Sequence, residues 1–227
     1  MKTIENLEKN LTENFQIRSK YYNELQDKLF DSIKEQIGIN IEKLYGKVFS
    51  SNNGFELTFK NSDNLIIGEL NVLRVHYSFA PAIQERFIQV YDEWGEEFKT
   101  FARQFYPLDI YKEALDSITL TAVKIIDEEH LELWIWNNAG QKYKLKFKSI
   151  EEYLEAGVQF KFVIFWQYFY IDNDAMDFSD PFTKEWVAFS YSDAISRMNE
   201  ALETLQEYFP KEDWSYQEKE LERVKDL

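Results

Sequence analysis

The chain has 227 residues, of which 41 are acidic and 26 are basic, and its net charge at neutral pH is −15. A chain of this length can bury a core without covalent cross-links, and the absence of cysteine excludes disulfides, thiolate zinc sites and cysteine nucleophiles. The most apolar stretch, residues 158–171, has 14 residues and is shorter than the roughly 20 that a membrane helix needs. Residues 1–11 lack the apolar run of a secretion signal, so we expect a cytoplasmic protein.

The N-terminal region carries apolar side chains at the three- and four-residue spacing of an amphipathic helix. These side chains are Ile4, Leu7, Leu11, Phe15, Tyr22, Leu25, Leu29 and Ile33. A polar stretch at residues 16–20 interrupts the stripe, so the pattern fits either two helices or one long helix. We predict a helical arm over residues 1–40, packed on a single domain over residues 41–227.

The next segment alternates apolar and polar side chains, with Phe55, Leu57 and Phe59 on one face. A second apolar run extends over residues 65–77, so the pair predicts a β-hairpin. After Pro81, apolar side chains return to helical spacing up to Phe105, which predicts a long helix.

Three short segments then follow one another at residues 118–126, 131–136 and 142–147, and they predict an antiparallel meander. The expected register places Trp136 opposite Lys142 and Trp134 opposite Lys144. One face of the meander is therefore expected to be apolar and the other amphipathic.

A short helix over residues 150–156 is expected to lead into a long central strand over residues 159–171, because aromatic side chains alternate along that segment. An apolar stripe from Ile195 to Phe209 predicts a C-terminal helix, and Ser215 with Glu218 offers a capping box for a last one. The predicted fold class is thus α+β, with an antiparallel sheet of hairpin, meander and long central strand packed with helices.

A run of carboxylates follows the predicted central strand, at Asp172, Asp174 and Asp177. Oxygen-rich loops at strand ends can hold magnesium or calcium, and such a site could serve a metal-dependent hydrolase. The spacing departs from an EF-hand, which needs a glycine where Asp177 stands and a glutamate where Thr183 stands. The alternative is an acidic surface loop without a metal.

The predicted meander also offers an aromatic surface. Trp134 and Trp136, joined by Thr119 and Thr121 of the neighbouring strand, could form a platform for a base, a sugar or a peptide. Alternatively, the helix predicted to end near Phe105 covers these side chains. The sequence has no glycine-rich phosphate loop and no nucleophile elbow, so we expect no cofactor and favour a non-catalytic protein over an enzyme.

The negative charge is concentrated at the C-terminal end, where residues 172–227 hold 15 acidic and 6 basic side chains, a net charge of −9. Such a field repels nucleic acid and anionic lipid. It would attract a basic protein, and we predict that the contact residues lie on the C-terminal helix or just beyond it. They are Glu200, Glu203, Glu207, Glu212 and Asp213.

Three hypotheses follow from these observations. The first is a non-catalytic acidic interaction protein that binds a basic partner, such as a toxin-neutralising immunity protein; bacterial immunity proteins share this composition, and the analogy is one of composition alone. The second is the carboxylate-dependent hydrolase with its site in the 172–180 loop, and the third is a small-ligand-binding module that uses Trp134 and Trp136. Acidity that merely keeps the chain dispersed is the simplest alternative. The oligomeric state is left open.

Overall fold

The computed structural model spans residues 1–227 and describes seven ranges of the chain. The described residues are 2–22, 28–49, 53–89, 95–111, 119–137, 142–172 and 187–226.

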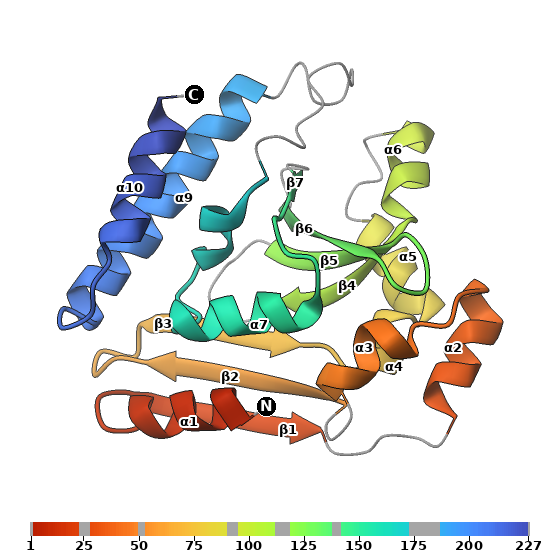
Figure 1. Ribbon diagram of the computed structural model, residues 1–227, viewed down its shortest axis with the longest axis horizontal. Helices are drawn as coiled ribbons and strands as arrows, with labels where there is room; N and C mark the ends of the chain where they lie inside the picture. The colour runs from red at the N-terminus through yellow and green to blue at the C-terminus, as the bar shows by residue number, and fades with distance from the viewer. Residues whose placement is uncertain are drawn as a thin grey trace.

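The described strands form one antiparallel sheet in which the order in space is the order in the chain (Figure 1). They are β1 (Gln16–Tyr22), β2 (Gly54–Lys60), β3 (Ile66–Val72), β4 (Phe105–Ile110), β5 (Thr119–Ile125), β6 (Leu131–Asn137) and β7 (Lys142–Lys144). The junction in the middle is thin, because β3 and β4 pair at the single position Val72 with Asp109. The sheet therefore has two well-paired halves, β1–β3 and β4–β7.

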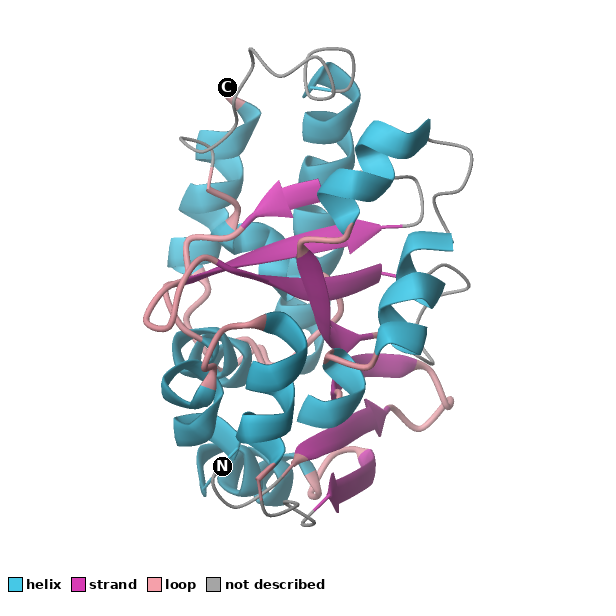
Figure 2. Ribbon diagram, turned by 90° about the vertical axis from the view of Figure 1, so that its right-hand side faces the viewer, coloured by secondary structure: helices cyan, strands magenta, loops and turns pink. Residues whose placement is uncertain are grey.

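Helices lie on both faces of this sheet, with α5 and α6 on one side and most of the others on the opposite side (Figure 2). The helical elements are α1 (Lys2–Leu11), α2 (Leu29–Ile37), α3 (Glu42–Phe49), α4 (Val75–Ser78), α5 (Pro81–Gln89), α6 (Gly95–Ala102), α7 (Ile150–Gln159), the 3-10 helix η2 (Trp166–Tyr170), α9 (Val187–Tyr208) and α10 (Ser215–Lys225). The fold class is α+β, as predicted. None of the described helices is both long and apolar enough to cross a bilayer.

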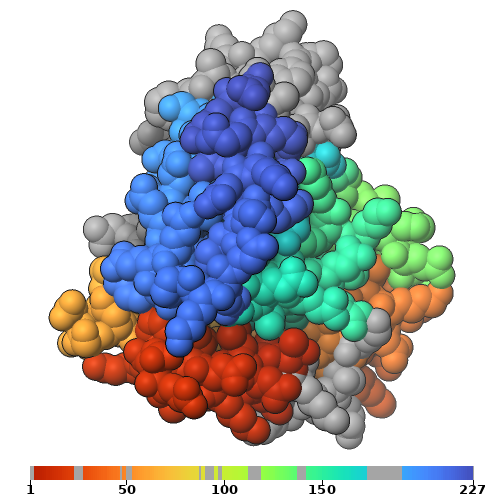
Figure 3. Space-filling view, turned by 60° about the vertical axis from the view of Figure 1, so that its left-hand side comes forward, coloured from red at the N-terminus to blue at the C-terminus, as the bar shows by residue number. Residues whose placement is uncertain are grey.

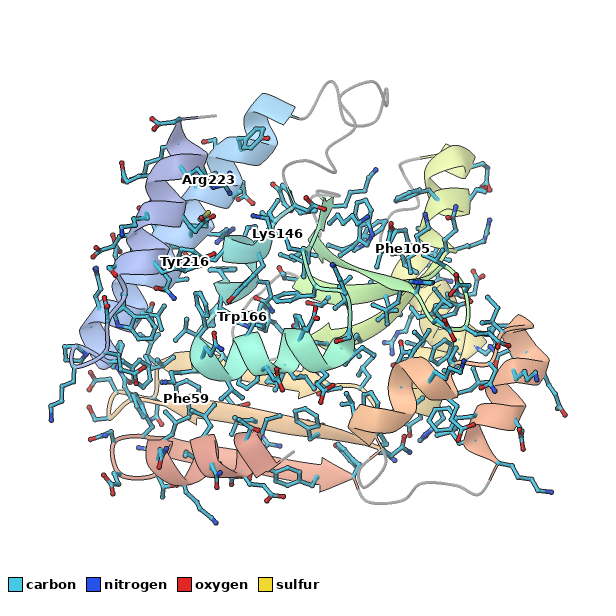
Figure 4. The ribbon with its side chains drawn as sticks, in the orientation of Figure 1. Phe59, Phe105, Lys146, Trp166, Tyr216 and Arg223 are labelled. Atoms are coloured by element: carbon cyan, nitrogen blue, oxygen red, sulfur yellow. The ribbon has the colours of Figure 1, made fainter. Side chains whose placement is uncertain are left out.

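Two apolar cores follow from this arrangement. The larger core fills the space between the sheet and the helices α1, α3 and α7, and Trp166 lies buried within it (Figure 4). The smaller core lies on the other face, where Phe105, Leu120 and Trp136 pack with residues of α5 and α6. Strands β4–β6 are thus covered on both faces, which fits their apolar character.

The predicted helical arm is wrong in its middle, because residues 16–20 belong to strand β1. The side chains of Ile17, Ser19 and Tyr21 alternate with exposed Arg18 and Lys20, which is the period of a strand. Ser19 Oγ and Tyr21 Oη both donate hydrogen bonds to Glu8 of α1, so the helix and the strand hold each other.

The long helix predicted to reach Phe105 is also wrong at its end. The structure has α5 and α6 over this segment, followed by strand β4, which contains Pro107. Proline is tolerated in a strand where the ladder is irregular, and the register between β4 and β5 shifts between Pro107 and Asp109. Pro107 therefore marks a bulge in strand β4.

The central strand predicted over residues 159–171 is not present. Helix α7 continues to Gln159, and a turn with positive φ at Lys161, Phe162 and Phe165 then leads into η2. We call residues 160–171 the aromatic wedge. It bridges the two halves of the sheet through two isolated β-bridges. Val163 of the wedge pairs with Gly68 of β3, and Ile171 of the wedge pairs with Leu145, just beyond β7.

Other predicted elements are confirmed. The hairpin is β2 with β3, and the meander is β5, β6 and β7, with Trp134 opposite Lys144 and Trp136 opposite Lys142. The C-terminal helices are α9 and α10. The predicted capping box is wrong, because Trp214 occupies the cap position and the Asp213 side chain accepts a hydrogen bond from the Ser215 N–H.

Candidate functional site

A groove lies between α9, the turn that joins β2 to β3, and the start of η2. Its volume is about 450 Å³. The lining residues are Asn64, Leu65, Ile66, Ile67, Ile164, Phe165, Arg197, Glu200, Thr204, Glu207 and Tyr208. We call it the α9 groove. Figure 3 shows the β2–β3 turn beside the lower part of α9 on the face that the two C-terminal helices cover.

One wall of the groove is a turn that its own side chains hold in place. The Asn61 Oδ1 accepts hydrogen bonds from the N–H groups of Asp63 and Leu65, and Asn64 has a positive φ of 64°. The Asn61 amide also donates to the hydroxyl of Tyr208 on α9 at 3.0 Å. This turn presents Leu65 to solvent at the mouth of the groove, with 61% of its surface exposed.

The opposite wall is polar and is supplied by α9. Arg197 lies over the ring of Phe165 at 4.4 Å and forms ion pairs with Asp193 and Glu200, both at 3.5 Å. Glu200 and Glu207 line the groove two helical turns apart and are exposed. The groove thus combines an apolar floor with a wall that carries more negative than positive charge.

The other predicted contact residues surround the groove or lie beyond it. Glu203 is exposed and lies three residues from Glu200 and four from Glu207, so it shares their side of α9. Glu212 forms an ion pair with Lys161 at 2.8 Å, and the Asp213 side chain accepts a hydrogen bond from the Ser215 N–H at 3.0 Å. Within the described part of the chain, neither Glu203 nor Glu207 has an ion-pair partner. These two carboxylates are therefore the most available of the five.

The predicted tryptophan platform is divided between two faces of the sheet. Trp134 pairs with Ala122 and Trp136 with Leu120, whereas Thr119 and Thr121 pair with Asn137 and Ile135 and point to the opposite side. A platform of all four side chains would need a register between β5 and β6 that differs by one residue.

Aromatic rings pack on both tryptophans, and Trp134 is half-buried. Trp136 has no exposed surface, and the rings of Phe101 and Phe105 pack on both tryptophans with centroid distances from 4.9 to 6.2 Å. The alternative that a helix covers this face is the one that the structure matches, since Phe101 belongs to α6.

The predicted metal loop begins at Asp172, whose N–H donates to the carbonyl of Lys144 at 2.8 Å. Asp174 and Asp177 lie outside the described residues. Among the residues that the structure does describe, no group of three or more carboxylate or imidazole side chains could hold a metal ion. The described residues therefore provide no ligand geometry in support of the metal-site hypothesis.

A buried polar network that the sequence reasoning missed lies between the sheet and α7. Asp109 is 2% exposed, and its carboxylate accepts hydrogen bonds from the Tyr153 hydroxyl at 2.7 Å and from the Asn71 N–H at 2.8 Å. Gln167 Nε2 donates to Tyr153 Oη at 3.2 Å, and Gln167 Oε1 accepts from Tyr111 Oη at 2.6 Å. Thr121 also contacts Tyr153 Oη at 3.0 Å.

Burial raises the pKa of Asp109 to about 6, and the hydrogen bonds from Tyr153 and Asn71 oppose this rise. The pKa of Tyr153 is raised well above its usual value, first by burial and then by the charge of Asp109. A perturbed carboxyl of this kind can mark an active site, but Asp109 is almost completely shielded from solvent. We therefore assign the network to the fold.

Comparison of the chain with known protein families, with curated proteins and with solved structures returned no match. The site therefore has to be interpreted from its own geometry.

Proposed function

We propose that the chain is a non-catalytic protein that binds a basic protein partner through the α9 groove, in the manner of an immunity protein that neutralises a toxin. The observation that carries this proposal is the juxtaposition of exposed Leu65 and an apolar floor with Glu200 and Glu207 in one groove. The absence of cysteine suits a reducing compartment, and we place this function in the cytoplasm.

The two walls of the groove have separate roles in this proposal. An apolar side chain of the partner would pack against Leu65, Ile66 and Ile164, and burial of apolar area would slow dissociation. Carboxylates at the rim would attract lysine and arginine side chains and speed association, because complementary charge mainly changes the on-rate. The net charge of −15 extends this attraction beyond the groove.

Arg197 shows how a guanidinium can be held at this surface. It lies between the Phe165 ring and the carboxylates of Asp193 and Glu200, which is the environment that a partner's arginine would need. Glu203 and Glu207 could offer a second such position to an incoming cation. Arg197 belongs to α9 itself, so it illustrates the geometry that a partner's cation would adopt beside Glu203 and Glu207.

The proposal is tested by charge reversal in the groove. We expect the double variant Glu203→Lys with Glu207→Lys to capture less of a basic protein from a lysate of the native organism at low salt, and to bind the purified partner with a slower on-rate. The matched control is Asp31→Lys with Glu35→Lys, which changes the net charge equally on exposed positions of α2. Leu65→Ser should instead raise the off-rate.

Two results would contradict the proposed function. One is a capture experiment in which no basic protein exceeds background at low salt. The other is a partner whose on-rate and salt dependence are the same for the groove variant and the α2 control, since the attraction would then come from net charge alone.

A further inference from the structure

The two edges of the sheet differ in a way that the proposed function does not use. At the β7 edge, the end of the aromatic wedge lies alongside the strand. Asp172 N–H donates to the Lys144 carbonyl at 2.8 Å, and Lys146 N–H donates to the Tyr170 carbonyl at 2.9 Å. This edge is three residues long and already has a neighbour.

The β1 edge is longer and more regular. All seven residues of β1 pair with β2 without a register shift, and the strand contains neither proline nor glycine. In the described sheet β2 is its single strand neighbour, and Figure 1 shows β1 at the end of the sheet with α1 in front of it. Long, regular edge strands are templates for pairing with another chain unless a protein protects them.

The surface of β1 opposite α1 is basic, although the protein is strongly acidic. Arg18 and Lys20 are exposed there, and Lys20 Nζ lies 4.6 Å from the centre of the Tyr22 ring. Arg74 lies over the same ring at 4.3 Å and over the Tyr77 ring at 4.7 Å. We call Arg18, Lys20 and Arg74 the β1 basic cluster.

Aromatic rings contact two of the three cations of the β1 basic cluster, Lys20 and Arg74. Tyr22 lies between two cations, and its hydroxyl donates to Glu56, which lies opposite Lys20 in the β1–β2 pair. Tyr77 is 42% exposed and extends the surface beyond Arg74. Rings that hold cations in place reduce the conformational freedom that those cations lose on binding an anion.

We propose that β1 accepts an acidic, extended segment of another protein as an additional strand, with carboxylates at alternate positions facing the β1 basic cluster. Main-chain hydrogen bonds to the edge would supply affinity, and the alternate side chains would supply selectivity. A second copy of β1 is the wrong occupant, because antiparallel pairing centred on Ser19 would place Arg18 directly opposite Lys20. This site is separate from the α9 groove and prefers the opposite charge.

The experiment uses the full chain and a synthetic nine-residue peptide of alternating glutamate and threonine. We expect the peptide to increase the hydrogen-exchange protection of the β1 amides. A peptide with the same sequence but N-methylated at alternate residues should bind about tenfold more weakly, because it keeps the charge and loses one row of main-chain donors. A peptide of alternating lysine and threonine is the charge control.

Lys20→Glu should weaken binding of the acidic peptide about fivefold or more, while Lys219→Glu on α10 makes the same charge change at a distant exposed position and should leave it unchanged. Circular dichroism and the melting temperature of both variants confirm that they fold.

Equal binding of the N-methylated peptide would overturn the proposal in favour of charge attraction alone. No binding at about 1 mM peptide would overturn it as well, as would tighter binding of an oligothymidine than of the peptide.

Discussion

The aromatic wedge and the outer face of α9 are opposite in almost every physical respect. Phe160, Phe162 and Trp166 of the wedge are almost completely buried, whereas Glu203 and Glu207 of α9 are exposed. The wedge bridges both halves of the sheet, and the α9 face contacts solvent. The comparison indicates that stability and recognition occupy separate parts of the molecule and can be changed separately.

The wedge holds its backbone in costly conformations. Lys161, Phe162 and Phe165 have φ values from 51° to 69°, a region that residues other than glycine adopt at a cost of about 1–3 kcal/mol each. Packing offsets this cost, since the Trp166 ring contacts those of Tyr153, Phe160 and Phe162 at 5.0 to 6.0 Å between centroids. Residues next to the wedge therefore have little freedom to change.

The largest effect should come from Gly68, where β3 meets the wedge. A Cβ at this position would lie 2.3 Å from the Phe59 ring and 2.6 Å from the carbonyl oxygen of Phe162. Because the main chain of the wedge would have to move, we expect Gly68→Ala to lower the free energy of unfolding by about 3 kcal/mol in a urea titration.

Gly46→Ala is the matched control for that substitution. A Cβ at Gly46 meets its nearest neighbour at 3.5 Å, an ordinary contact, and the position lies inside α3. The substitution should stabilise the protein by about 0.5–1 kcal/mol, since alanine favours a helix over glycine. Comparable stability of Gly68→Ala and the wild type would show that the wedge does not restrict β3.

The next effect concerns Asp109 and its pH dependence. Its pKa of about 6 lies above the value of about 3.9 in an unfolded chain, so the folded state binds the proton more tightly. The resulting stabilisation is complete below about pH 4 and is lost as the pH rises through about 6. Relative to Asp109→Asn, which cannot titrate, the wild type should lose about 2 kcal/mol between pH 4.5 and 7.

Denaturant titrations of both proteins across this pH range measure the difference directly, and other carboxylates cancel because both proteins share them. Glu69 faces the same region and contributes to the raised pKa through its charge. A pH-independent difference between the two proteins would mean that Asp109 is ionised in the folded state down to its ordinary pKa.

The smallest effect should be that of Glu203→Lys with Glu207→Lys on stability. Both side chains are exposed and lack an ion-pair partner among the described residues, so the free energy of unfolding should change by less than about 0.5 kcal/mol. A loss of binding with unchanged stability would separate the two regions. A loss above about 2 kcal/mol would show that the α9 face also supports the fold.

Local patterns were enough to predict elements whose partners are close in the chain. The hairpin β2–β3 and the meander β5–β7 show alternation and turns within a few residues, and the stripe from Ile195 to Phe209 identified α9. The wedge was misread because its buried aromatics alternate like those of a central strand. The positive φ values that bend it come from tertiary packing and leave no mark in composition.

The sequence predicted the α9 wall of the groove but not its apolar wall. Charge and helical spacing identified Glu200 and Glu207, but Leu65 and Phe165 reach the same groove from distant parts of the chain. Asp109 was not predicted, because its partners Asn71 and Tyr153 are distant from it in the sequence. The β1 edge was missed because seven residues between two helices were assigned to a helical arm.

The order of the strands also has a consequence for how the protein is made. Since each strand pairs with the one before it, most of the sheet can form while the chain is still being synthesised, by closing short loops. The wedge cannot take part until residue 171 has left the ribosome, and until then β3 lacks Val163 and the thin junction with β4 has no support. We therefore expect the aromatic core to close late in folding, when the wedge docks against β3 and the end of β7.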